Sequence, residues 1–188
     1  MKRNDAVYRL VLAALLVAIG ILIPMTFPKI TLPLMSFTLA SHVAIFLAIF
    51  LSPGVAIIVS LGTTLGFFLS GLPLEVTLRA LSHVVFAIVG ALWIQKRPQL
   101  LQHKGEAVAF CLVTNLVHAL MELIVISALF LGGFQRVVSN FSEAGYMAII
   151  LLVGLGTLIH GSVDFIISFL VWQPLKKVPG LSKIASAK

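Results

Sequence analysis

Residues 74–94 read LEVTLRALSHVVFAIVGALWI, an apolar run that contains both Arg79 and His83. About 20 mostly apolar residues in a helix span the hydrocarbon core of a bilayer, so this run has the length of a transmembrane helix. An ionisable side chain inside such a helix costs several kcal/mol unless it is paired or hydrated. The stretch therefore predicts a membrane-spanning helix whose polar side chains face a partner, a cavity or a ligand.

The composition of the whole chain also indicates a membrane protein. Of the 188 residues, 60% are hydrophobic and 10% are charged, and the mean hydropathy is +1.15. A soluble domain typically carries about 25% charged residues, so this chain has too few polar side chains to cover a water-exposed surface. The first apolar run has no small-residue cleavage pattern, which argues against a cleaved signal peptide. The single cysteine, Cys111, excludes an internal disulfide.

Six apolar segments predict an all-α fold, a bundle of six transmembrane helices that forms one domain over residues 1–188. The segments cover residues 7–25, 37–51, 55–72, 74–94, 106–131 and 146–172. Most of them reach the roughly 18 residues that indicate a spanning helix. The second segment is short, and we expect it to cross a locally thinned bilayer or to extend beyond these bounds.

The basic residues predict which side of the membrane each connection occupies. Ten of the 13 Lys and Arg residues flank the segments on one face, namely Lys2, Arg3, Arg9, Lys96, Arg97, Lys104, Lys176, Lys177, Lys183 and Lys188. Lys29 and Arg136 fall in connections on the other face. By the positive-inside rule the ten are cytoplasmic, so both termini are expected in the cytoplasm. The net charge of +7 is then a signal of topology and not of nucleic-acid binding.

Three connections are expected on the outer face: residues 26–36, the turn at 71–73 and residues 132–145. The first contains Pro28 and Pro33, which should keep it extended, and it is expected to form a stiff, re-entrant or lid-like loop over a binding site. The chain has no Gly-rich or Walker-type nucleotide motif. We therefore expect that it does not hydrolyse ATP itself.

Polar side chains recur inside the last three segments at helical spacing. Residues four apart lie on one face of a helix, one turn from each other. We expect the three polar faces to converge on one interior cavity. Arg79 is the strongest candidate for a ligand contact, because a guanidinium suits a carboxylate or phosphate partner. The residues on these faces are Arg79 and His83, then Asn115, His118 and Glu122, then His160 and Asp164.

The same side chains allow other interpretations. Polar residues can join transmembrane helices without binding a ligand. A metal-uptake subunit is the second possibility, although no HxxxH, CxxC or HExxH spacing occurs and a nearby guanidinium repels a cation. An intramembrane enzyme is the third, although Ser82 beside His83 does not place a nucleophile against its base. We expect no catalytic residue, no metal and no other cofactor. The metal ligands available to the second possibility are His42, His83, His118, His160, Glu122 and Asp164.

Small residues in the first segment and two longer stretches carry a resemblance to a known family. Residues 13–18 read AALLVA, in which Ala14 and Ala18 form an AxxxA pattern. Residues 37–71 read FTLASHVAIFLAIFLSPGVAIIVSLGTTLGFFLSG, and residues 78–91 read LRALSHVVFAIVGA. With its six expected spans, the chain resembles the substrate-binding S components of energy-coupling factor (ECF) vitamin transporters, and these stretches look similar to the niacin-type branch. S components use AxxxA against a transmembrane coupling subunit, where small residues allow close helix approach.

The resemblance implies a binding and transport role in a bacterial plasma membrane, with several passes through the lipid. The substrate would be a small water-soluble vitamin captured from outside, niacin first, then pantothenate or a pyridoxine-like vitamin. A coupling subunit and two ATPase subunits would supply the energy, with Ala14 and Ala18 as the docking residues. Asp164 lies deeper toward the cytoplasm and is left out of the expected site. Carried over to this sequence, the expected substrate-binding residues are Arg79, His83, Asn115, His118, Glu122 and His160.

Overall fold

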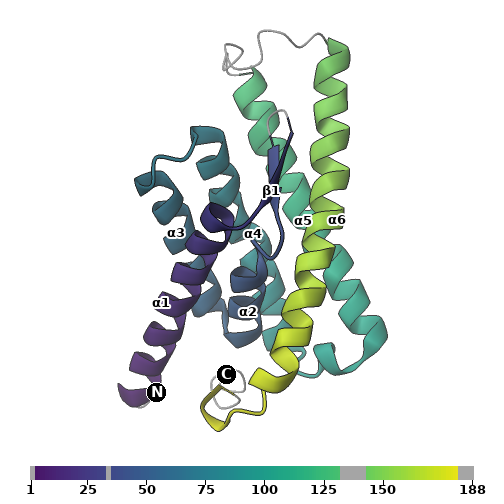
Figure 1. Ribbon diagram of the computed structural model, residues 1–188. Coiled ribbons are helices and arrows are strands. Elements are labelled where there is room, and N and C mark those ends of the chain that lie inside the picture. The colour runs from purple at the N-terminus through teal and green to yellow at the C-terminus, as the bar shows by residue number, and fades with distance from the viewer. Residues whose placement is uncertain (1–2, 33–34, 132–142, 182–188) are drawn as a thin grey trace.

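The computed structural model describes residues 3–32, 35–131 and 143–181, which form an all-α bundle with one short hairpin (Figure 1). Four helices, α1, α4, α5 and α6, are long and apolar enough to cross a membrane by length and composition, and α3 is a shorter apolar helix. In chain order the elements are α1 Arg3–Thr26, β1 Lys29–Leu32, β2 Met35–Thr38, α2 Val43–Leu51, α3 Pro53–Leu69, α4 Leu74–Lys96, η1 Leu100–Gln102, α5 Lys104–Leu131 and α6 Glu143–Leu175.

Helix α2 corrects the prediction for residues 37–51. Residues 37–38 belong to strand β2, and the helix begins only at Val43. Its nine residues rise about 14 Å, less than half of the roughly 30 Å hydrocarbon core, so α2 does not span a bilayer by itself. All nine are buried, as expected for a helix that is apolar on every side. The second apolar segment is therefore a core helix of the bundle.

A break at Ser52 separates α2 from α3. The Ser52 backbone is extended, with φ −173° and ψ 159°, and Pro53 occupies the first turn of α3. Proline fits this position because its missing N–H would have no helical partner there. The Ser52 hydroxyl oxygen accepts a hydrogen bond from the Val55 N–H at 3.3 Å and caps α3. The two helices are therefore separate elements, and the predicted division between segments 37–51 and 55–72 is confirmed at this point.

The connection expected to be a lid-like loop contains a β-hairpin. Strand β1 pairs antiparallel with β2, with Lys29 opposite Thr38 and Leu32 opposite Met35. The extended backbone agrees with the expectation from the prolines, whereas the strand pairing was not predicted. Pro33 lies outside the described residues, as does most of the expected third outer connection, residues 132–142.

Helix α1 has one face on the bundle and one face outside it. Gly62 and Gly66 of α3 let the two helices approach closely, since a Cβ at Gly62 would lie 2.6 Å from Cγ2 of Val17. Ala14 and Ala18 lie on the exposed face of α1. The AxxxA pattern is therefore available to a partner helix and is not used in packing the bundle.

The ends of the long helices fall at two opposite sides of the molecule (Figure 1). The start of α1, the start of α5 and the end of α6 lie at one side, and the hairpin lies toward the other. The segment after α6 meets α1 at the former side, because a Cβ at Gly180 would lie 2.9 Å from the Tyr8 hydroxyl oxygen. The charged flanks of residues 3–9, 96–104 and 176–177 thus share one side of the bundle.

Candidate functional site

A cavity of about 320 Å³ lies between the hairpin and helices α2 to α6. The polar faces of α4, α5 and α6 converge on it, as the helical spacing predicts. Five of the six expected substrate-binding residues line it, namely Arg79, His83, His118, Glu122 and His160.

The sixth, Asn115, lies behind this cavity. It is fully buried, and its Nδ2 donates a hydrogen bond to the Cys111 carbonyl oxygen at 2.9 Å. Its Oδ1 lies against Gly161 of α6, where a Cβ would have no room. Asn115 therefore packs α5 against α6, and the structure does not place it among the residues that line the cavity.

Glu122 of α5 joins three helices in the wall of the cavity. Its Oε2 accepts hydrogen bonds from Arg79 Nη2 of α4 at 2.9 Å and from Thr157 Oγ1 of α6 at 2.6 Å. Its Oε1 lies 3.4 Å from His83 Nε2 and 3.5 Å from His118 Nε2. The Glu122 side chain is almost fully buried, and the Arg79 guanidinium supplies the opposite charge that this burial requires.

Asp164 of α6 holds the turn that joins β2 to α2. Its Oδ1 accepts a hydrogen bond from the Ala40 N–H at 2.8 Å, and its Oδ2 accepts one from the His42 N–H at 2.9 Å. A carboxylate is favoured here because these N–H groups lie at the positive end of α2. Ala40 has a φ of 67°, a left-handed conformation that costs energy for a residue with a Cβ. The hydrogen bond from the Ala40 N–H to Asp164 helps to stabilise this conformation.

Asp164 also fixes two histidine side chains without lining the cavity itself. Its Oδ2 lies 3.0 Å from His42 Nδ1 and 3.3 Å from His160 Nε2. The Ser41 hydroxyl oxygen lies 2.9 Å from His160 Nε2 and extends this network toward the cavity. The residue that the sequence left out of the site is therefore the one that positions His42 and His160 within it.

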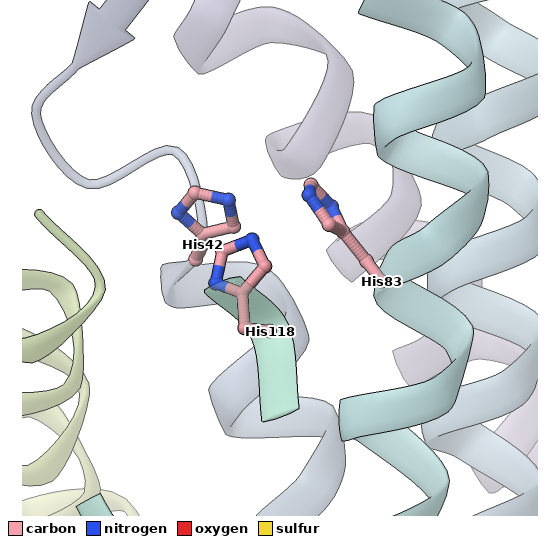
Figure 2. A group of neighbouring side chains, drawn as sticks. All are labelled: His42, His83 and His118. Carbon is pink, nitrogen blue, oxygen red and sulfur yellow. The ribbon is translucent and has the colours of Figure 1, made fainter. Parts of the chain in front are cut away.

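Three histidines from separate elements lie close together (Figure 2). His42 precedes α2, His83 is on α4 and His118 is on α5. Their ring centroids are 4.8 Å apart for His42 and His83, and 4.7 Å apart for each of the other two pairs. One nitrogen atom from each imidazole lies within 4.8 Å of the corresponding atoms of the other two.

The other residues that line the cavity were not among the expected substrate-binding residues, and they include Phe37, Ser41, His42 and Thr157. Two of these four carried a usable signal. His42 directly precedes nine apolar residues, and Thr157 lies three residues before His160 on the same helical face. Phe37 is placed by the hairpin, with its ring centroid 5.2 Å from that of His160, and nothing local to its sequence indicates this.

The cavity combines a permanent cation with flat ring surfaces. A guanidinium presents five N–H donors, and Arg79 Nε has no hydrogen-bond partner among the described residues. Donors therefore remain for a second carboxylate besides Glu122. Phe37 and Phe67 add apolar surface to the lining. The volume lies at the lower end of the roughly 300–1,000 Å³ range of small-molecule sites, so the cavity suits a small, flat anion.

Comparisons with known proteins give the family. No family model matches the chain, and no solved structure matches it. The niacin transporter NiaX of Lactococcus lactis subsp. cremoris (strain MG1363) is 38% identical over 164 residues, which are 87% of this chain and 72% of that transporter. Together with the membrane-spanning helices, this similarity indicates a multi-pass protein of a bacterial plasma membrane. The chain belongs to the family of the niacin transporter NiaX, and its resemblance to the S components of ECF vitamin transporters is confirmed.

Proposed function

We propose that this chain is the substrate-binding subunit of a niacin importer. The observation that carries the proposal is the similarity to a niacin transporter over most of the chain, combined with a cavity of suitable size that contains Arg79. Niacin is a small aromatic ring with one carboxylate, so it matches a site that offers one guanidinium and flat ring surfaces. Binding and release require no covalent step, and we assign no catalytic residue.

Arg79 is proposed to hold the niacin carboxylate. Glu122 accepts a hydrogen bond from Nη2 at 2.9 Å and, with Thr157 and the two neighbouring imidazoles, fixes the orientation of the guanidinium. The remaining donors can form a two-pronged contact with a carboxylate, which a lysine could not. His83, His118 and His160 complete the proposed substrate contacts in the cavity.

We further propose that the bundle forms one domain, crosses the membrane six times in all and places both termini in the cytoplasm. The basic flanks at residues 3–9, 96–104 and 176–177 support this orientation, since they lie at one side of the molecule. The second crossing is proposed to be made by β2 and α2 together, because the nine residues of α2 are too short to cross alone. Cysteine-accessibility labelling tests the orientation: residues 96–104 should react only from the cytoplasmic side, and reaction from outside intact cells would refute it.

The energy for uptake is proposed to come from a coupling subunit and two ATPase subunits, with α1 as the docking helix. Ala14 and Ala18 support this, because both lie on the exposed face of α1 at a spacing that permits close approach of another helix. The hairpin is proposed to gate the cavity from outside, since Lys29, Phe37 and Thr38 contribute to the lining. Chemical labelling of Lys29 should slow when niacin is bound, whereas equal rates would count against a gate.

The proposal is tested by identifying the small molecule that co-purifies with the protein. Mass spectrometry of ligand released from detergent-purified protein should detect niacin, and cells that express the chain with an energising module should accumulate radiolabelled niacin. An unlabelled excess of niacin should suppress that accumulation. A different vitamin in the released fraction, with no niacin uptake, would overturn the substrate assignment.

A further inference from the structure

We propose that His42, His83 and His118 form a binding site for one divalent transition-metal ion beside the Arg79–Glu122 pair. Imidazole nitrogen is a good ligand for zinc, nickel, copper and cobalt. Three protein ligands leave a tetrahedral ion with one open position. With an ion bound, His83 and His118 would contact a substrate through the ion's open position, whereas the presence of the ion does not depend on which vitamin the protein transports.

The spacing of the three rings fits a three-histidine metal site. A Zn–N distance of 2.0–2.1 Å and tetrahedral angles would place the ring centroids about 5 Å apart. The three observed separations are 4.7–4.8 Å, so the rings already form a nearly equilateral triangle of this size. The nitrogen atoms lie within 4.8 Å of one another, and an ion bound to all three would bring them to about 3.3 Å apart. Figure 2 shows the three rings gathered around a common space.

The carboxylates around the cluster are arranged as outer-shell partners of metal-bound histidines. Histidine ligands usually direct their second ring nitrogen to a carboxylate, which orients the ring and raises its basicity. His42 Nδ1 lies 3.0 Å from Asp164 Oδ2, and His83 Nε2 lies 3.4 Å from Glu122 Oε1. Among the described residues, neither Nε2 of His42 nor Nδ1 of His83 has a hydrogen bond. Each ring thus keeps one nitrogen for an ion.

His118 provides an independent observation that points to a ligand. The residue is fully buried, and neither of its ring nitrogens has a hydrogen-bond partner among the described residues. Its nearest carboxylate oxygen, Glu122 Oε1, lies 3.5 Å from Nε2. Within the described part of the chain, this 3.5 Å contact is all that compensates the burial of the ring, and a metal–nitrogen bond would supply a further partner.

The charges near the cavity also favour a cation. Among the described residues that line it, Lys29 and Arg79 are cationic, and Glu75 and Glu122 are anionic. Asp164 adds one more carboxylate directly behind His42. With neutral imidazoles, the region therefore has one more anionic than cationic side chain, so its net charge does not repel a divalent ion. A divalent ion would make the net charge of the region positive. Glu122, which holds the Arg79 guanidinium at 2.9 Å, would shield the ion from that cation.

Two alternatives to this metal site involve some of the same residues. Imidazoles can pack edge to face without an ion, since aromatic pairs at these separations are stable by themselves. His42, His160 and Asp164 form a second group whose possible ligand atoms lie within 4.8 Å of one another. We favour the first group because it alone contains His118, the ring without hydrogen-bond partners.

The test uses full-length protein purified in detergent without a polyhistidine tag, stripped with chelator and titrated with Co²⁺ alone. We expect about one equivalent to bind and to give the strong visible absorption of a four-coordinate site, which Zn²⁺ should then abolish. His83→Gln and His118→Gln should each eliminate this absorption. Asp164→Asn should weaken Co²⁺ affinity about 10- to 100-fold, as is typical for loss of an outer-shell partner. His103→Gln, at an exposed position beyond η1, is the matched control and should bind like the native protein.

Native protein that binds no Co²⁺ or Zn²⁺ under these conditions would overturn the proposal, whether or not it binds niacin. Loss of the absorption in His160→Gln, with retention in His83→Gln, would also overturn it and would move the ion to the second group. Equal loss in His103→Gln would show that binding is not at the cluster. Because the native spectrum is read first, a variant that fails to fold does not leave the proposal undecided.

Discussion

Glu122 and Asp164 are both buried carboxylates beside histidines, yet the bundle holds them in different ways. Glu122 is held by side chains of α4 and α6, and one of these side chains, Arg79, carries a permanent charge. Asp164 is held by backbone N–H groups at Ala40 and His42 and by the His42 ring. The Glu122 arrangement places a cation with spare N–H donors in the cavity, whereas the Asp164 arrangement fixes a backbone turn.

The difference assigns the two carboxylates different tasks. Loss of a charged partner at Glu122 would leave a buried ion uncompensated, whereas loss of a hydrogen bond at Asp164 would loosen the connection between β2 and α2. We therefore expect the Glu122 region to govern niacin affinity and the Asp164 region to govern the position of His42 and the hairpin.

The largest effect is expected for Arg79→Ala. Truncating one partner of a buried charge pair typically costs about 2–5 kcal/mol, so niacin affinity should fall more than about tenfold, and thermal stability should fall because Glu122 remains buried and unpaired. Arg79→Lys should recover only part of the affinity, since an ammonium cannot form a two-pronged contact.

The double variant Arg79→Ala with Glu122→Gln separates stability from binding. Removing both charges should restore much of the melting temperature, because no isolated ion remains, while niacin affinity should stay low. Recovery of affinity in the double variant would show that Arg79 serves only to neutralise Glu122.

A smaller effect is expected for Asp164→Asn. The amide keeps one acceptor oxygen but loses the other, so at least one of the Ala40 and His42 N–H groups loses its acceptor, at a cost of about 1–3 kcal/mol. The melting temperature should fall, and niacin affinity should fall less than in Arg79→Ala. An unchanged melting temperature would contradict the anchoring role.

Ala14→Trp and Ala18→Trp should leave niacin affinity unchanged and abolish uptake. Both residues lie on the exposed face of α1, away from the two carboxylates, so a bulky ring there should separate the docking helix from its partner without reaching the cavity. Uptake in cells and niacin binding by purified protein are measured side by side. Equal losses of both would show that α1 supports the binding site itself.

The smallest effect is expected for Glu106→Gln, at a carboxylate that is exposed where the other two are buried. Oε2 of Glu106 lies 3.8 Å from Nη1 of Arg97, and the two side chains are 41% and 67% accessible. Exposed pairs contribute about 0–1 kcal/mol, so the melting temperature should hardly change. A fall in melting temperature as large as that of Asp164→Asn would show that burial does not account for the difference between these carboxylates.

The sequence predicts the long helices well because their limits are local. The segments expected at 74–94 and 106–131 correspond to α4, Leu74–Lys96, and α5, Lys104–Leu131. Pro73 and the charged residues of the following connection set these bounds without help from the rest of the chain. The helical spacing of His118 and Glu122 likewise places both side chains on one face, 3.5 Å apart.

The sequence fails where distant segments decide the structure. The start of α2 depends on Asp164, which follows it by more than 120 positions, so hydrophobicity alone extends that helix too far back. The strand pairing of the hairpin has no clear local signal. The absence of HxxxH spacing does not exclude a metal site either, because His42, His83 and His118 come from three elements that meet only in the folded bundle.

The most direct test of the central claim compares niacin with its amide by isothermal titration of the native protein and Arg79→Ala. If the guanidinium holds the carboxylate, native protein should bind the acid far more tightly than the amide. The alanine variant should lose most of its affinity for the acid, and its affinities for acid and amide should be nearly equal. Equal affinities of the native protein for the two compounds would contradict the proposed role of Arg79 and the preference for niacin that rests on it.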